Sequence, residues 1–164
     1  MRLTIFTDYT LRALMYLGMN RDRLVTIQDI ADLHTISKSH LTKVVHQLGV
    51  AGLIETVRGR NGGLRLNREP NQINIGEVVS MSEPDFFMAA CFGSEHTSCA
   101  HQGDCRLTAT LAQATQAYLN VLDGVTLADL LPGPAGPGLR VPGLHPVTLH
   151  RAPARGAAGP ARSK

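Results

Sequence analysis

Apolar residues recur with helical spacing in the first third of the chain. Two sets lie at positions i, i+3, i+4 and i+7, namely Leu11, Leu14, Met15 and Gly18, and then Leu41, Val44, Val45 and Leu48. A shorter apolar set between them consists of Ile27, Ile30 and Ala31. Because residues at this spacing share one face of an α-helix, the pattern predicts three consecutive amphipathic helices.

Residues that can cap a helix precede each of these segments. Thr7 can cap the first helix and places Asp8 in its first turn, where the helix dipole favours a carboxylate. Thr26 followed by Asp29 predicts a capping box for the second helix, and Ser37 can cap the third. The third helix is expected to end in the glycine-containing stretch 49–52.

A two-stranded hairpin is predicted after the third helix. Residues 53–57 and 64–66 have strand character, and Asn61-Gly62 in the turn between them can supply a positive φ. Helix, helix, turn, helix and hairpin is the order of a winged helix-turn-helix. The predicted fold class is therefore mainly α with a small β-hairpin.

A fourth short helix over residues 75–81, closed by Pro84, is followed by a stretch without sustained periodicity. A longer helix is then predicted from residue 105 to residue 122, with an apolar seam of Leu107, Leu111, Ala114, Tyr118 and Val121. At 1.5 Å per residue it would be about 27 Å long, enough for two protomers to pair along it. A helix packed against its own domain would show the same seam. Thr126 is expected to cap a last turn that ends at Leu131.

These elements divide the chain into four segments. Residues 1–83 form the predicted winged helix-turn-helix domain, 84–104 a cysteine-containing loop, and 105–131 a dimerisation helix with its terminal turn. Residues 132–164 hold seven of the nine prolines and six glycines, a composition that predicts a disordered basic tail.

The net charge of +3 conceals an uneven distribution along the chain. Residues 1–70 carry ten Lys or Arg against six Asp or Glu, and residues 71–131 carry one against seven. Residues 132–164 carry five basic residues and no acidic one. A basic N-terminal domain with helix-turn-helix character favours DNA as the partner.

Candidate DNA-binding residues lie on the third helix and on the hairpin. The helix face opposite the apolar set, together with its N-terminal end, offers Ser37, Lys38, Ser39, His40, Thr42, Lys43 and His46. The hairpin adds Arg58, Arg60, Asn61 and Arg65, which are placed to enter a minor groove beside the helix. A solvated polar face, or a winged helix that binds proteins, would carry similar residues.

All three cysteines, Cys91, Cys99 and Cys105, lie within one stretch of the chain. Their spacing fits neither zinc knuckles nor the ferredoxin run, and wide gaps suit a loop wrapped around a cluster. Spacing alone leaves open an iron-sulfur cluster, a zinc ion, or metal-free thiols of which two form a redox disulfide. Three thiolates leave one position for a further ligand: Glu95, His96, His101, Asp104, a residue elsewhere, or solvent.

Other features exclude several classes of protein. We find no secretion signal and no apolar run long enough for a membrane span, so a soluble, cytoplasmic protein is expected. An odd number of clustered cysteines also fits a reducing compartment. No nucleophile-base-acid set or phosphate-binding loop is visible, so an enzyme is not expected.

Taken together, the two halves of the sequence resemble the winged-helix iron-sulfur regulators of bacteria. The matching stretches are 3–14, 57–66, 75–79, the three cysteines with Arg106 and Leu107, and 126–130. The resemblance implies a homodimer with one cluster, [4Fe-4S] or [2Fe-2S], per protomer on Cys91, Cys99 and Cys105. It also implies a palindromic operator, read by the helix after Ser37 and by the wing.

Nitric-oxide sensors are the members that the sequence resembles most. In them a carboxylate on the first helix of the partner subunit completes the cluster, and Asp8 occupies the matching position. A related regulator of cluster assembly uses a histidine three residues after its last cysteine, where this chain has Thr108. The implied function is a repressor in which nitrosylation or loss of the cluster releases operator DNA and derepresses nitric-oxide detoxification genes.

Other interpretations use the same residues. By its position alone, Asp8 is a first-turn acid that can pair with Arg12 at i+4. The protein as a whole could also sense iron-sulfur status or redox stress, or be a zinc-stabilised winged-helix interaction module.

Overall fold

The computed structural model describes residues 2–89, 92 and 105–132. Its elements are α1 (Ile5–Met19), α2 (Ile27–His34), α3 (Lys38–Val50), β1 (Ile54–Val57), β2 (Gly63–Leu66), the 3-10 turn η1 (Pro70–Gln72), α4 (Ile75–Ser82), α5 (Arg106–Asp123) and α6 (Leu127–Leu130). The order and type of these elements confirm the predicted winged helix-turn-helix class, mainly α with one hairpin. None of the described helices is both long and apolar enough to cross a membrane.

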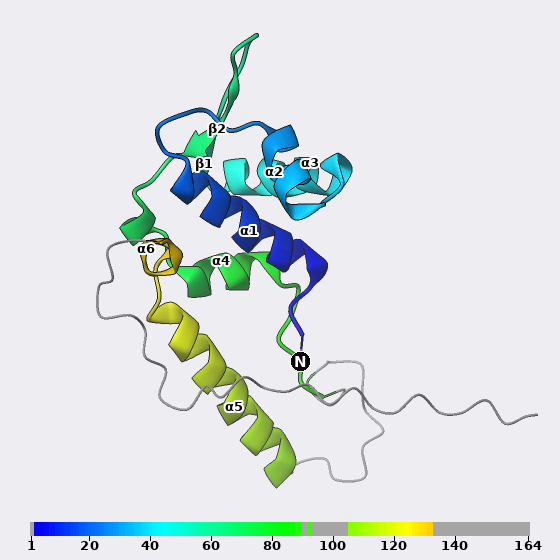
Figure 1. Ribbon diagram of the computed structural model, residues 1–164. Coiled ribbons are helices and arrows are strands. Elements are labelled where there is room, and N and C mark those ends of the chain that lie inside the picture. Colours follow the sequence, from blue (N-terminus) through cyan, green and yellow to red (C-terminus); the bar gives the residue numbers. More distant parts are fainter. Residues whose placement is uncertain (1, 90–91, 93–104, 133–164) are drawn as a thin grey trace, which may run out of the picture.

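Helix α1 lies at the centre of the domain, with α2 and α3 on one side and α4 on the other (Figure 1). Its core face consists mainly of Ala13, Leu14 and Leu17, all of them buried. The predicted apolar set of α3 packs against it, with Leu41, Val44 and Leu48 fully or almost fully buried. Burial of one such leucine or valine contributes about 1.5–3 kcal/mol, so this interface fixes α3 on α1.

The start of α1 differs from the prediction. Thr4, and not Thr7, is the N-cap, and the Thr4 Oγ1 atom accepts the Thr7 backbone N–H at 3.2 Å. Thr7 lies completely inside the core, which explains why its side chain is unavailable as a cap at the surface. Asp8 nevertheless lies in the first turn of α1, as predicted.

The other predicted caps are confirmed. Thr26 and Asp29 form the capping box of α2, and Ser37 Oγ accepts the backbone N–H of His40 at 3.4 Å at the start of α3. Near the end of the described chain, Thr126 and Asp129 form a second capping box, which begins α6.

The hairpin is confirmed, but its tight turn is made differently. Strands β1 and β2 pair antiparallel, and β2 also forms a bridge from Leu64 to Val25 in the loop before α2. The positive φ, 119°, occurs at Gly59 rather than in the Asn61-Gly62 pair. Gly62 is required for a different reason, because a Cβ atom there would overlap the carbonyl oxygen of Val57.

Helix α5 packs against α4 and extends away from the winged helix (Figure 1). None of its residues is buried, in contrast to the chain that follows it. Val125 and Leu127 enter the core, where Leu127 N–H donates to the Ile73 carbonyl at 2.8 Å. Most of the expected cysteine loop, 84–104, and almost all of the expected tail, 132–164, lie outside the described residues.

Candidate nucleic-acid interface and metal ligands

The outer face of α3 carries the side chains that the sequence assigns to DNA. All seven predicted residues of this face are exposed: Ser37, Lys38, Ser39, His40, Thr42, Lys43 and His46. Their hydrogen-bonding capacity differs, because the Thr42 hydroxyl already donates to the Lys38 carbonyl at 2.8 Å. The exposed cationic and imidazole groups of Lys38, His40, Lys43 and His46 therefore dominate this surface.

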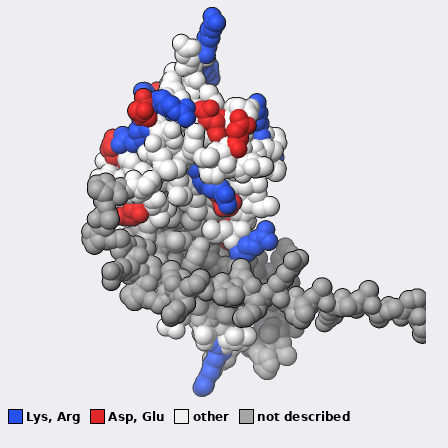
Figure 2. Space-filling view, in the orientation of Figure 1, with Lys and Arg blue, Asp and Glu red and all other residues white. Residues whose placement is uncertain are grey.

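Basic side chains also lie at the tip of the hairpin, at the end of the described part of the chain opposite α5 (Figures 1 and 2). Arg58, Arg60 and Asn61 lie in this turn and are exposed. Arg65 is different, because it lies on β2 directly opposite Glu55 in the strand register. Its guanidinium donates to Glu55 Oε2 from Nη2 at 2.8 Å and from Nε at 2.9 Å. The structure therefore separates Arg65 from the exposed arginines of the tip.

A hollow between α3 and β1 contains a residue that the sequence pattern missed. It is lined by Thr42, Val45, His46, Gly49, Val50 and Thr56. Thr56 lies on β1 and faces this hollow only because the hairpin folds back along α3. No local periodicity relates it to His46, so only the tertiary structure adds its hydroxyl to the candidate interface.

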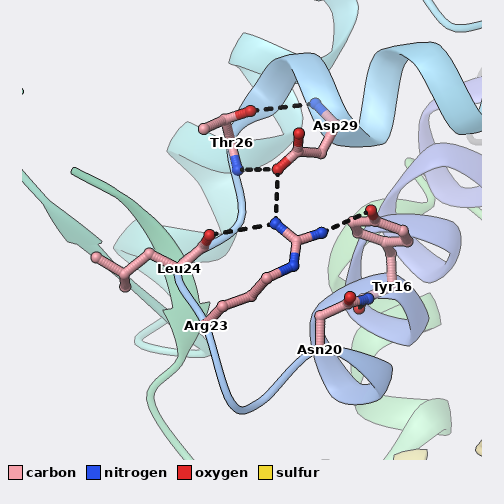
Figure 3. Close-up of polar contacts among 6 residues, drawn as sticks. All are labelled: Tyr16, Asn20, Arg23, Leu24, Thr26 and Asp29. Carbon is pink, nitrogen blue, oxygen red and sulfur yellow. Dashed lines mark hydrogen bonds and ion pairs between the residues drawn. The ribbon is translucent and has the colours of Figure 1, made fainter. Parts of the chain in front are cut away.

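A polar network at the loop between α1 and α2 fixes where the helix-turn-helix begins (Figure 3). The Arg23 guanidinium donates to Asp29 Oδ2 at 3.0 Å and to the Tyr16 hydroxyl at 3.0 Å. The Asp29 carboxylate also accepts the Thr26 backbone N–H at 2.9 Å. This backbone hydrogen bond, followed by that of Arg23, lowers the pKa of Asp29 below its ordinary value. The sequence predicted the capping box, but it did not predict that Arg23 and Tyr16 would join it to α1.

Among the predicted cluster ligands, Cys105 is the one cysteine that lies in the described part of the chain. It is half-buried and is the N-cap residue of α5, where the positive end of the helix dipole favours an anionic ligand such as a thiolate. Cys91 and Cys99 lie outside the described residues. Within the described ranges, no group of three or more His, Cys, Asp and Glu residues is arranged to hold a metal ion.

Asp8 projects from α1 and is paired with Arg12. The Arg12 Nε atom donates to Asp8 Oδ1 at 3.0 Å and to Oδ2 at 2.9 Å, and both side chains are nearly half exposed. This is the i, i+4 pair that the sequence offered as the alternative to a metal ligand. The neighbouring His34 has a lowered pKa, first because it is partly buried and then because of the Arg12 charge, while Asp8 acts in the opposite direction.

Comparison with known proteins assigns the chain to a family. The model of the Rrf2 family, described as "Iron-dependent Transcriptional regulator", matches residues 3–133. The chain belongs to the Rrf2 family. Similar Rrf2 relatives include the "HTH-type transcriptional regulator NsrR" of Bacillus licheniformis, 49% identical over 132 residues, or 80% of this chain and 92% of that protein.

A second relative and a solved structure agree with this assignment. The NsrR protein of Shouchella clausii is 48% identical over 132 residues, covering 80% of this chain and 89% of its own length. The structure titled "T. potens IscR" superposes with a TM-score of 0.62 at 26% identity, over 79% of this chain and 85% of that one. As an Rrf2 member, the chain is a transcriptional regulator and not an enzyme, which confirms the expectation from the sequence.

Proposed function

We propose that this Rrf2 regulator is a repressor that binds operator DNA while it holds an iron-sulfur cluster, and that it senses nitric oxide through that cluster. The observation that carries the DNA part is the joint exposure of α3 and of the basic hairpin tip on one winged helix. The similarity to relatives named NsrR, together with Cys105 at the start of α5, supports the cluster part.

DNA recognition follows from the two exposed elements. In this proposal the N-terminal half of α3 enters the major groove, where Lys38, His40 and Lys43 reach base edges and phosphates. Arg58 and Arg60 of the hairpin tip enter the adjacent minor groove, with Asn61 beside them. Arg65 is expected to contribute less than the tip arginines, because Glu55 already neutralises it.

A second copy of the chain is the proposed partner of α5. The predicted seam of Leu107, Leu111, Ala114, Tyr118 and Val121 has no buried member, and the exposed fractions of Leu107 and Val121 are 63% and 61%. Apolar side chains this exposed gain stability when a partner covers them. Two protomers joined along α5 would present two α3 helices to the two half-sites of a palindromic operator.

The proposed cluster ligands are Cys91, Cys99 and Cys105 of one protomer together with Asp8 contributed by the partner subunit. Arg12 does not prevent this role, because an exposed pair of this kind contributes only about 0–1 kcal/mol. A carboxylate is a hard ligand among thiolates, so the cluster would supply an iron that nitric oxide can reach. A free Asp8 carboxylate pairs with Arg12 on α1, the helix against which α3 is packed.

Substitution of Asp8 tests this proposal. We would purify the Asp8→Ala variant anaerobically and measure its affinity for a duplex selected from a random pool by the cluster-bound wild type, before and after nitric oxide. Nitric oxide is expected to weaken wild-type binding strongly. To change the DNA-binding form from about 99% to about 1% of the protein, its reaction must shift the equilibrium between the two forms by about 5.5 kcal/mol. The response of Asp8→Ala should be much smaller, and that of the exposed control Asp22→Ala should equal that of the wild type.

Two results would contradict parts of the proposal. An unchanged response of Asp8→Ala would remove Asp8 from the mechanism. If the purified protein is colourless and contains stoichiometric zinc and no sulfide, the site holds a structural zinc ion and not an iron-sulfur cluster. Parallel exposure to oxygen and to reductant distinguishes a nitric-oxide sensor from a sensor of redox stress or cluster status.

A further inference from the structure

The C-terminal end of α4 is a junction at which α1, α3 and α5 come together. The chain leaves α4 at Glu83, the C-cap residue, and reaches Cys91 eight positions later. Pro84 follows directly, and a residue before proline is restricted to extended conformations. Glu83 accordingly has φ −88° and ψ 136°, and its half-buried side chain extends from a fixed backbone position.

Glu83 binds the first residue of the α1 cap. Its Oε1 atom accepts the backbone N–H of Thr4 at 2.7 Å, across 79 positions of sequence. This N–H belongs to the helix start, where backbone donors lack partners within the helix and the dipole favours a carboxylate. Glu83 therefore fixes the end of α1 that carries Asp8 one turn later.

The DNA-reading helix is tied to the same junction through Gln47. Its Nε2 atom donates to the Met81 carbonyl at 3.1 Å, and the residue is half-buried on the inner side of α3. Met81 lies in the last turn of α4, where carbonyl groups have no intrahelical partner. Met81 and Glu83 lie two positions apart on the chain. Met81 binds α3, and Glu83 binds the start of α1.

Helix α5 reaches the junction as well. It packs against α4, and the pKa of its half-buried Tyr118 is raised, first by burial and then by the Glu83 charge. Cys105 is the N-cap residue of this helix, so α4 and α5 are the helices that precede and follow the cysteine-containing segment in the sequence.

We propose that Glu83 and Gln47 are positioning residues that couple the cysteine-containing segment to the DNA-reading helix by joining α4 to α1 and to α3. This inference rests on the proposed cluster-dependent repressor. A change in the segment after Glu83 moves the end of α4, and the two hydrogen bonds carry that displacement to the Asp8 helix and to α3.

The experiment compares operator affinity with and without the cluster in four variants. Glu83→Ala and Gln47→Met remove the two hydrogen bonds, while Glu83→Gln keeps an acceptor and serves where the alanine variant does not fold. Glu77→Ala, an exposed acid on the same helix, is the matched control. The probe is the duplex selected by the cluster-bound wild type. The quantity measured is the dissociation constant without the cluster divided by the dissociation constant with it.

A second readout uses the cluster-free protein. Amide hydrogen exchange at Thr4 reports the Glu83 bond directly, independently of any cluster. We expect this amide to exchange at least about tenfold faster in Glu83→Ala and to be nearly unchanged in Glu77→Ala.

The expected result is a ratio that falls by about three- to tenfold in Glu83→Ala and in Gln47→Met, with a smaller loss in Glu83→Gln. Unchanged ratios, with faster Thr4 exchange, would show that the two bonds only stabilise the fold, and would overturn the inference while leaving the proposed function intact. Equal affinities of the wild type with and without its cluster would instead reject the proposed function itself, and this inference with it.

Discussion

At the scale of single residues, two helical glycines differ in whether the structure has room for a side chain. Gly76 is buried near the start of α4, and a Cβ atom there would overlap the Asp123 carboxylate and lie 2.9 Å from the Asp123 backbone nitrogen. Gly49 lies near the end of α3, and a Cβ atom there would have no heavy atom within 4 Å. The first glycine allows α4 to approach the end of α5, whereas the second only leaves α3 more flexible.

Substitution by alanine should therefore have opposite effects at the two positions. We expect Gly76→Ala to lower the free energy of unfolding by about 1–3 kcal/mol, because the backbone of Asp123 must move. Gly49→Ala should raise it by about 0.5–1 kcal/mol, because alanine favours the helix without any clash. Urea unfolding of the two variants measures both changes. Equal changes at both positions would contradict the close approach at Gly76.

At the scale of elements, α2 is held by charge and capping together. The side chain of Asp29 accepts hydrogen bonds from Thr26 and from Arg23, and Arg23 in turn binds Tyr16 of α1 (Figure 3). This network joins the start of α2, the helix that precedes α3, to α1. The lowered pKa of Asp29 makes the contribution dependent on pH.

The sign of this dependence follows from the lowered pKa. Stability from the ionised Asp29 is fully present above the ordinary carboxyl pKa of about 4, and is lost as the pH falls through the lower folded value. We expect Asp29→Asn to lower the free energy of unfolding by about 1 kcal/mol at pH 7. The difference from wild type should shrink below pH 4. Asp22→Asn is the control, and a difference that stays constant with pH would contradict the argument.

At the scale of the whole molecule, ion pairs neutralise some of the basic residues in segment 1–70 and leave the uncompensated positive charge on only part of the surface. Among the described residues, Arg12, Arg21, Arg23 and Arg65 are each paired with a carboxylate. The basic residues of α3 and of the hairpin tip have no such ion pair within the described ranges. The attraction for DNA is therefore stronger at the proposed interface than the average charge suggests.

The five basic residues of segment 132–164 are expected to add non-specific attraction. A chain ending at Leu131 should then show a smaller slope of log affinity against log salt, by up to about 0.9 for each lost phosphate contact. Titration of the full chain and of the shortened chain at several salt concentrations measures both slopes. The preference for the selected duplex over random DNA should be unchanged. Identical slopes would mean that this segment does not contact DNA.

The sequence predicted the elements of this fold well because helix periodicity and capping depend on residues three or four positions apart. The boundaries of α3 and of α5 agree with prediction to within one or two residues. The errors occur where burial intervenes. Thr7 is a residue type that often caps helices, but packing of α1 on its neighbours places it in the core, and Thr4 is the cap.

The candidate site was predicted in part, for the same reason. Exposure of the outer face of α3 and of the hairpin tip follows from local pattern and is present in the structure. The Glu55 pair of Arg65 depends on strand register, and the place of Thr56 depends on how the hairpin folds against α3. The roles of these residues in binding, and those of the cysteines and Asp8, stay predictions.

By itself, then, the sequence determined the winged-helix class, the exposed basic residues and the stretch that carries the cysteines, because each is written in neighbouring residues. Only the tertiary structure decided which groups from distant parts of the chain bind one another. The hydrogen bonds of Glu83 to Thr4 and of Gln47 to Met81 join residues 79 and 34 positions apart. No periodicity specifies such pairs, since they form only when the packed core brings the ends of three helices together.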